Sequence, residues 1–247
     1  MAQLITVPAA DGPAEAYLAE PSGPSRGAVL FVMDAIGLRP RIAEMVDEIA
    51  SWGYTVLAPN VFYRVGTAEQ TSPGADTDLT DPEQRAAYFA ESPVMTWVGS
   101  LTPDLVARDA EAYAEYLATR APGPLGVTGY CFGARLATRI GGQLSQVVAV
   151  GGFHGSGLIT DADDSPHLSL RPGVAYVYGH ADNDRGMPPE AVAELGEVLE
   201  AVDSEALNSI YPGAPHGYTM SDTSAWNADG CERHFRELRA TLDRAFA

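Results

Sequence analysis

The stretch GVTGYCFGARLA, residues 126–137, determines how we interpret the rest of the chain. A short apolar run ends near Gly129, a cysteine follows at position 131, and Gly133 opens a segment with helical apolar spacing. A G-x-C-x-G pattern between a strand and a helix is typical of a sharp turn that exposes a nucleophile, because glycines relieve its crowding. The N-terminus of the following helix favours an anion such as a thiolate. We therefore interpret Cys131 as a nucleophile, and the alternative is a buried cysteine packed beside glycines.

Apolar runs and helical patterns alternate along most of the chain around this turn. Residues 27–33 are a continuous apolar run, as expected of a strand buried on both faces. A further strand is predicted at QVVAVGGF, residues 146–153. Residues 41–53 repeat apolar side chains at helical spacing and end in glycine. Two strand-like runs around an Asp-Gly turn predict an N-terminal hairpin. The alternation predicts an α/β fold with a mostly parallel sheet and helices on both faces, in a single domain over residues 1–247.

Residues 64–103 form the least regular part of the sequence. They are rich in polar and turn-forming residues, with a short helix predicted at EQRAAYFAE, residues 83–91. A long irregular segment in a compact domain is often a lid or a binding loop, and a plain surface excursion fits as well. An amphipathic helix follows, for which Asp104 is the expected N-cap.

Composition excludes several classes of function. The formal net charge is -18, so no basic patch is available to neutralise the phosphates of nucleic acid or of anionic lipid. No apolar run approaches the roughly 20 residues that span a bilayer, and the N-terminus lacks the basic and apolar regions of a secretory signal. The two cysteines show no metal-binding spacing. We expect a cytoplasmic monomer or homodimer that acts on a small molecule without metal or cofactor.

A histidine and an aspartate that lie later in the chain complete a candidate catalytic triad with Cys131. A thiol nucleophile needs a histidine base that an acid orients. His216 follows the last predicted strand, in the rigid turn PGAPHGY. For the acid we favour Asp182, three residues after Gly179, where the chain leaves the sheet; Asp184 is a competitor. His154 follows another strand, where it could line the pocket or be structural.

These motifs resemble those of the dienelactone hydrolase family. The similarity runs over nearly the whole chain and is carried by LFVMDAIGL, GYCFGARLA, YGHADND and PGAPHGY. The resemblance implies the α/β-hydrolase fold and hydrolysis of a carboxylic ester or lactone through an acyl-cysteine, with no cofactor.

The resemblance also implies roles for residues beside the nucleophile. A family glutamate that holds the cysteine thiol in the resting enzyme falls on Asp34, which is one methylene shorter and could alternatively cap backbone amides. The two oxyanion-hole N–H groups fall on Ala35 and Phe132.

Substrate-binding positions depart from the family pattern. Met220 stands where the family has a carboxylate-binding arginine after the histidine. Arg85 and Tyr88 lie near the family's other carboxylate-binding pair, but with the spacing shifted by one, so an exposed helical arginine is the alternative for Arg85. Arg85, Tyr88 and His154 are the candidate substrate-binding residues. The weakened clamp favours a neutral ester over a muconate-type lactone.

A second function remains open from the sequence. The chain could be a non-catalytic binding or regulatory protein with a hydrolase fold, and the departures at Asp34 and Met220 favour it. The intact order of cysteine, acid and histidine argues against it. Alkylation of Cys131 well below pH 8.5, the usual pKa of a free thiol, would distinguish the two.

Overall fold

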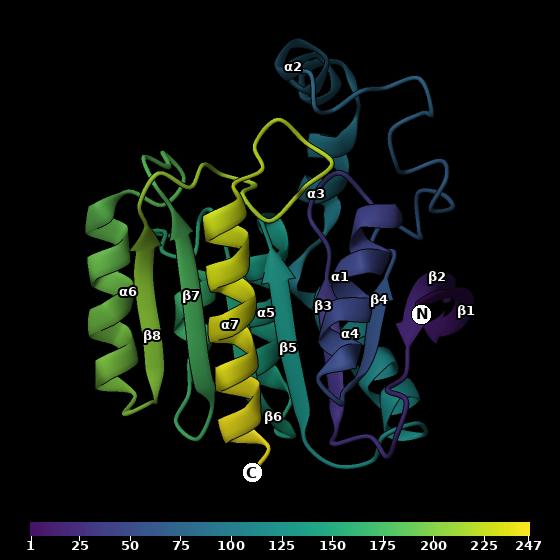
Figure 1. The fold of residues 1–247 in the computed structure, drawn as a ribbon. Coiled ribbons are helices and arrows are strands. Elements are labelled where there is room, and N and C mark those ends of the chain that lie inside the picture. Colours follow the sequence, from purple (N-terminus) through teal and green to yellow (C-terminus); the bar gives the residue numbers. More distant parts are fainter.

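An eight-stranded sheet forms the centre of the molecule in the computed structural model, which describes residues 1–247 (Figure 1). The strand order is β1-β2-β4-β3-β5-β6-β7-β8. Strands β1 to β2 and β2 to β4 pair antiparallel, and all other pairs are parallel. The strands are β1 (Gln3–Ala9), β2 (Gly12–Ala19), β3 (Ala28–Val32), β4 (Thr55–Pro59), β5 (Leu125–Tyr130), β6 (Val147–Phe153), β7 (Ala175–Ala181) and β8 (Ala206–Tyr211). The predicted hairpin and mostly parallel α/β sheet are confirmed.

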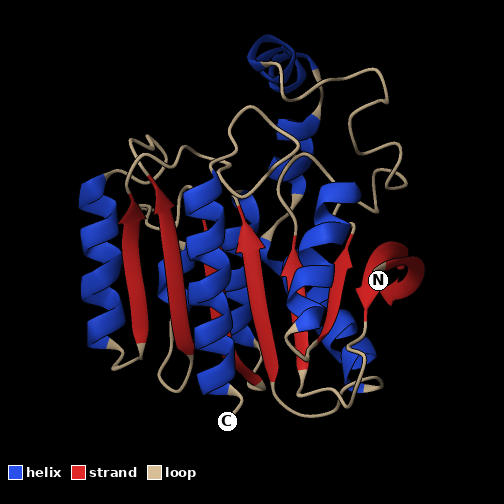
Figure 2. Ribbon diagram, in the orientation of Figure 1, coloured by secondary structure: helices blue, strands red, loops and turns tan.

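Helices cover both faces of this sheet (Figure 2). They are α1 (Pro40–Ser51), α2 (Pro82–Glu91), α3 (Val94–Ser100), α4 (Pro103–Ala118), α5 (Phe132–Gln143), the 3-10 helix η1 (Pro166–Ser169), α6 (Pro189–Ala201) and α7 (Ala228–Ala245). Helices α1 and α7 pack on one face, and α4, α5 and α6 pack on the other. The strands of the centre are buried along their whole length, which explains their continuous apolar runs.

One predicted helix boundary is wrong. Helix α4 begins at Pro103, and the Thr102 hydroxyl, not Asp104, caps it by accepting a hydrogen bond from the Leu105 amide. Proline at the first helical position fixes that start, because its ring presets the helical φ angle. Asp104 lies in the first turn, where its charge complements the helix dipole.

Residues 64–103 contain the predicted helix, here α2, and a second helix, α3. Both stand above the carboxyl ends of the parallel strands (Figure 1). Helix α2 buries none of its residues, whereas α3 buries Val94 and Val98. The Trp97 ring of α3 packs at a tilt of 56° against Phe62, with ring centroids 5.8 Å apart. The segment therefore covers the edge of the sheet where ligands bind in such folds. That the chain forms one domain stays a prediction.

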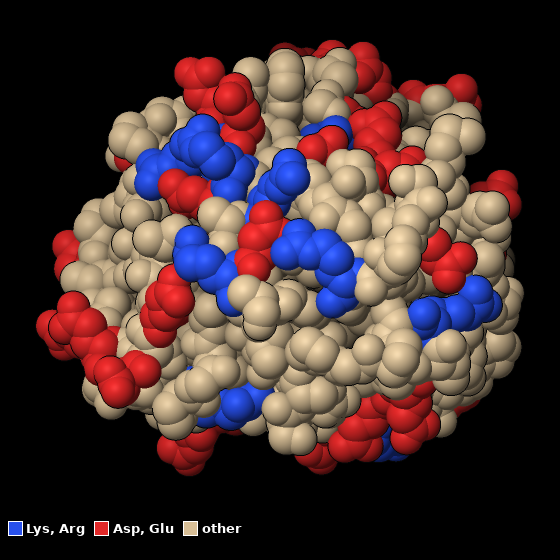
Figure 3. Space-filling view, turned by 60° about the horizontal axis from the view of Figure 1, so that its bottom comes forward, with Lys and Arg blue, Asp and Glu red and all other residues tan.

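Surface charge is mixed locally despite the acidic total. On the face shown in Figure 3, arginines lie among acidic side chains. Ion pairs such as Arg26–Asp243 and Arg244–Glu205 join opposite charges on the protein. None of the helices combines the length and apolarity needed to cross a bilayer.

The chain order places a crevice beside β3 and β5. From β3 the chain moves to β4 on one side, and it then returns to β5 on the other side. Ligands of open α/β sheets bind at such a switch point, beyond the carboxyl ends of the strands. Cys131 follows β5 directly, and Asp34 stands two residues after the end of β3.

Candidate active site

Cys131 occupies a strained turn between β5 and α5. Its φ and ψ angles are 56° and −124°, a backbone conformation that costs about 1–3 kcal/mol for a non-glycine residue. A Cβ atom on Gly129 would collide with the Gly133 carbonyl, and one on Gly133 would lie 2.5 Å from the Met33 carbonyl oxygen. The two glycines therefore allow the close approach that the sequence pattern predicts.

A continuous hydrogen-bonded chain runs from Cys131 through His216 to Asp184. The Cys131 Sγ atom lies 3.1 Å from His216 Nε2, and His216 Nδ1 lies 2.6 Å from Asp184 Oδ2. The Ser156 hydroxyl lies 3.5 Å from the same Nδ1 atom. The Asp184 side chain is only 8% exposed and that of His216 is 31% exposed. The arrangement has the geometry of a nucleophile, a base and an orienting acid.

The predicted acid, Asp182, is wrong. Its carboxylate instead accepts a hydrogen bond from the Gly213 amide at 2.8 Å, and its own amide donates to the Ala214 carbonyl. The chain turns at Asn183, whose φ angle is 55°, and this left-handed residue directs Asp184 toward the imidazole. Asp182 therefore fixes the loop that carries His216 without contacting the ring.

The chain from Cys131 to Asp184 favours a charged imidazole. Burial alone would lower the pKa of His216, but the Cys131 sulfur and the Asp184 carboxylate raise it to about 10. In return, although burial opposes it, the hydrogen bond from His216 lowers the pKa of Asp184. An imidazolium held by a carboxylate is the partner that stabilises a thiolate.

His154 is structural, so its predicted place in the substrate pocket is wrong. The residue is fully buried. Its Nδ1 atom accepts a hydrogen bond from the Cys131 amide at 3.2 Å, and Nε2 lies 2.8 Å from the Thr219 hydroxyl. Burial and the charge of His216 lower the pKa of His154 well below its ordinary value. The neutral ring therefore ties the turn at Cys131 to the segment after His216.

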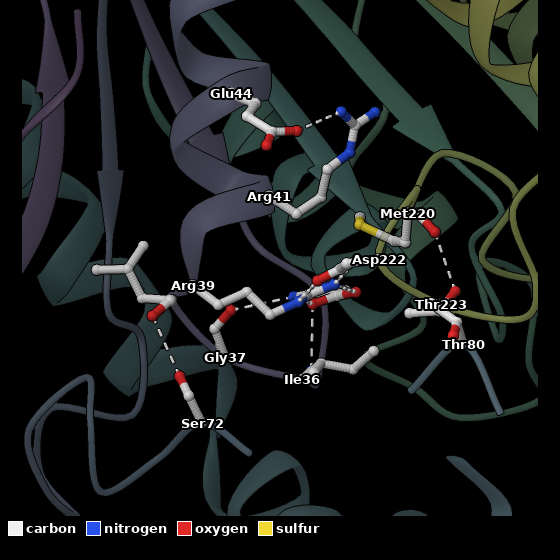
Figure 4. Close-up of polar contacts among 12 residues, drawn as sticks. Ile36, Gly37, Arg39, Arg41, Glu44, Ser72, Thr80, Met220, Asp222 and Thr223 are labelled. Carbon is white, nitrogen blue, oxygen red and sulfur yellow. Dashed lines mark hydrogen bonds and ion pairs between the residues drawn. The ribbon is translucent and has the colours of Figure 1, made fainter. Parts of the chain in front are cut away.

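Asp34 does not contact the thiol, so its predicted role as the thiol-orienting acid is wrong. Its Oδ1 atom accepts hydrogen bonds from Arg39 Nη1 at 2.6 Å and from the Ile36 amide, and its Oδ2 atom accepts from Arg39 Nη2. Arg39 also donates from Nε and Nη2 to Asp222, as Figure 4 shows. Asp34 and Arg39 are 5% and 6% exposed. Both oxygens of the Asp34 carboxylate accept hydrogen bonds from the Arg39 guanidinium, so the carboxylate is already paired without the Cys131 sulfur.

Arginines from the start of α1 hold the segment that follows His216. Arg39 binds Asp222, and Arg41 donates two hydrogen bonds to the Thr219 carbonyl, at 3.1 and 2.8 Å. Met220 is buried between these anchors, and its carbonyl accepts a hydrogen bond from Thr223 (Figure 4). The β3–α1 connection therefore determines the position of the histidine loop.

The expected oxyanion-hole groups are free of protein acceptors. The Ala35 amide makes no backbone hydrogen bond, and Phe132 is the first residue of α5, where an N–H has no partner within the helix. Both residues follow the two strands that flank the crevice. These amides are available to a ligand, and their role as oxyanion donors stays a prediction.

Comparison with known proteins identifies the family. The model described as "Dienelactone hydrolase family" matches residues 14–246. The chain belongs to the dienelactone hydrolase family. A "Putative carboxymethylenebutenolidase" of Synechocystis sp. is 24% identical over 242 residues, covering 96% of this chain and 94% of the relative. "Carboxymethylenebutenolidase 1" of Cupriavidus pinatubonensis is 27% identical over 217 residues, covering 87% of this chain and 83% of the relative.

Solved structures give the same fold. The crystal structure of a "Putative Dienelactone Hydrolase" from Klebsiella pneumoniae aligns with a TM-score of 0.81 at 18% identity, covering 99% of this chain and 98% of that one. This dienelactone hydrolase family member therefore has the α/β-hydrolase fold. Its family membership and its carboxymethylenebutenolidase relatives show that it is a hydrolase.

Two predicted substrate-binding residues of this family member lie beside the site. Arg85 Nη2 is 3.5 Å from the position that a Cβ atom on Gly217 would occupy, next to His216. Tyr88, on the same helix, is half-buried, and burial together with the negative charge of Asp34 raises its pKa. Helix α2 thus lies near both the loop of His216 and the ion pair of Asp34. Substrate contact by Arg85 and Tyr88 stays a prediction.

Three residues of the site were missed from the sequence. Arg39 and Arg41 stand in the motif RPR at the start of α1, and Ser156 stands in the loop after β6. Two arginines close to an acidic residue at the start of a loop indicate an ion pair. This ion pair was not predicted, because the family resemblance assigned Asp34 to the thiol. No group of three or more histidines, cysteines or acidic residues is placed to hold a metal ion.

Proposed function

We propose that this hydrolase cleaves a carboxylic ester or lactone through an acyl-cysteine on Cys131. His216 serves as the base and Asp184 as the acid that orients it. The single observation that supports the proposal most is the unbroken chain from Sγ to Nε2 at 3.1 Å and from Nδ1 to the carboxylate at 2.6 Å.

Acylation begins with Cys131 as a thiolate and His216 as an imidazolium, which carries the thiol proton. The Cys131 sulfur attacks the carbonyl carbon, and the Ala35 and Phe132 amides donate hydrogen bonds to the oxyanion. Each such donor contributes roughly 3–4 kcal/mol to lowering the barrier. Collapse of the tetrahedral intermediate breaks the carbon–oxygen bond. The leaving alkoxide takes its proton from the His216 imidazolium, and the acyl group remains on sulfur.

Deacylation uses the same groups in the same order. His216 removes a proton from water, and the resulting hydroxide attacks the thioester carbonyl. The two amides again bind the oxyanion. The carboxylic acid leaves, and the thiolate of Cys131 is again paired with the His216 imidazolium. Asp184 stays ionised throughout and keeps Nδ1 protonated.

Esters and lactones suit this site better than amides. The imidazolium has a raised pKa and is a weak acid, so it protonates a poor amine leaving group slowly. Met220 supplies no charge where the family has an arginine, and its side chain is buried. A neutral carbonyl centre next to Cys131 therefore fits the immediate surroundings of the thiol.

Hydrolysis of p-nitrophenyl acetate and a panel of small lactones tests the proposal. We expect wild-type activity that disappears in Cys131→Ala and is strongly reduced in Cys131→Ser. An inactive wild type, or a Cys131→Ala variant with full activity, would overturn the proposal. Circular dichroism of each variant serves as the control for folding.

A further inference from the structure

A groove with two arginines lies beside the nucleophile turn. It has a volume of about 330 Å³ and lies between the α3–α4 connection, helix α5 and residues 157–166. Apolar side chains of Val98, Leu101, Phe132 and Leu136 line one part of it, and Arg135 with Arg139 lines another. The groove therefore combines an apolar surface with a basic one.

Arg135 has no partner in the protein. Its Nε atom is buried and makes no hydrogen bond, and the side chain forms no ion pair. Arg139 has only a long contact of 3.5 Å with Asp164, whose side chain is 60% exposed. By contrast, arginines such as Arg39 and Arg64 each bind two carboxylates. A buried guanidinium donor without an acceptor costs stability, which a bound anion would restore.

The two guanidinium groups also repel each other. They stand four residues apart on α5, where like charges are neighbours on one helix face. Burial and the positive charge of Arg135 lower the pKa of Arg139 although Asp164 opposes this. The planar fork of each arginine matches the two oxygens of a carboxylate or phosphate. The Thr160 hydroxyl, which also lines the groove, can donate a further hydrogen bond.

The groove adjoins the proposed catalytic groups. Phe132 lines it and directly follows Cys131 in the chain. A Cβ atom on Gly157 would lie 3.6 Å from the Arg135 side chain, and the preceding residue, Ser156, contacts His216. Two residues that line the groove, Phe132 and Gly157, are therefore chain neighbours of Cys131 and of Ser156, which contacts His216.

We propose that this groove binds an organic anion, in which a carboxylate or phosphate pairs with Arg135 and Arg139 and an apolar body packs on Val98, Leu101 and Leu136. The anion is either the far end of an extended substrate or a separate molecule of the same chemistry. The first source rests on the proposed function, whereas binding as such does not.

Calorimetric titration of the Cys131→Ala protein with octanoate and with octyl phosphate tests binding without turnover. We expect saturable binding that is weakened at least tenfold by Arg135→Gln, since a hydrogen bond to a charged group is worth about that factor or more. Arg236→Gln is the matched control, because it removes the same charge from an exposed site on α7. Octanamide, which lacks the charge, should bind at least tenfold more weakly than octanoate. Absence of saturable binding, or equal binding by the Arg135→Gln protein, would overturn the proposal.

Ester hydrolysis then distinguishes the two sources. The comparison is between the p-nitrophenyl monoester of suberic acid, which carries a terminal carboxylate, and p-nitrophenyl octanoate. If the anion belongs to the substrate, Arg135→Gln lowers kcat/KM for the charged ester at least tenfold and leaves the neutral ester within about twofold. If both esters respond equally while octanoate still binds through Arg135, the ligand is a separate molecule. Failure of the proposed function would appear as an inactive wild type, and the calorimetric result would still decide the groove.

Discussion

Asp34 and Asp184 follow two strands of the same sheet, and their partners give them opposite chemistry. Both side chains are buried, at 5% and 8% exposure. Asp34 is bound by the guanidinium of Arg39, which does not release a proton in a protein. Asp184 is bound by the imidazole of His216, which can gain and lose one. The cation that faces a buried carboxylate at a strand end therefore decides its role. A guanidinium makes it part of a fixed ion pair, and an imidazole lets it assist proton transfer.

Breaking the pair of Asp184 and His216 should lower kcat more than any other change considered below. Asp184→Asn should lower kcat by about 10³- to 10⁴-fold, because an amide neither stabilises the imidazolium nor fixes its tautomer. Steady-state kinetics with p-nitrophenyl acetate measures the loss. Asp182→Asn is the matched control and should stay within about tenfold of wild type, since Asp182 contacts only the backbone of the loop. Equal losses in both variants would contradict the assignment of Asp184.

Breaking the ion pair of Asp34 and Arg39 should instead lower the free energy of unfolding. Arg39→Gln leaves Asp34 buried without its cation, which costs about 3–5 kcal/mol of the free energy of unfolding. Urea denaturation followed by circular dichroism measures this cost. Asp222→Asn removes the partner that is 33% exposed, so its cost should be about 1 kcal/mol or less. A stability of Arg39→Gln equal to wild type would show that the cluster is not held as described.

The titration of His216 sharpens the contrast further. Its raised pKa means that the charged ring stabilises the fold fully below the ordinary pKa of about 6.5. That stabilisation is lost as the pH rises through about 10. NMR of the ring protons should show a midpoint near 10 in wild type. In Cys131→Ser and in Asp184→Asn the midpoint should move down, because each loses one group that favours the charge. A wild-type midpoint near 6.5 would contradict the coupling of sulfur, ring and carboxylate.

The smallest effect is expected at Asp34. Asp34→Asn should change the rate of Cys131 alkylation by iodoacetamide less than about threefold at every pH where the variant is folded. The reason is that Asp34 makes its hydrogen bonds to Arg39 and Ile36 and none to sulfur. His216→Ala, which removes the group that does contact sulfur, is the positive control. A large shift of the alkylation profile in Asp34→Asn would restore Asp34 as a thiol-orienting residue.

The sequence predicted the fold because its signals are local. Continuous apolar runs, helical spacing and the two glycines around Cys131 each act over a few residues. The hairpin, the parallel sheet and the strained turn follow from them. The position of His216 after the last strand was also predictable, since the carboxyl ends of parallel strands meet at one edge of the sheet.

The details of the site were not predictable, because each depends on a direction or a distant partner. Asp182 and Asp184 are equivalent in sequence, and only the left-handed turn at Asn183 decides which faces the imidazole. Asp34 looked like a thiol partner until the structure placed Arg39 against it. Similarly, His154 binds the Cys131 amide because two loops remote in sequence meet there.

Peptide mapping of the acid-quenched enzyme during turnover of p-nitrophenyl acetate tests whether an acyl-cysteine forms. We expect an acetyl group on the peptide that contains Cys131, and its loss on treatment with hydroxylamine, which cleaves thioesters. An acetyl group on a serine or histidine peptide instead, with Cys131 unmodified and hydrolysis intact in Cys131→Ala, would contradict the acyl-cysteine mechanism.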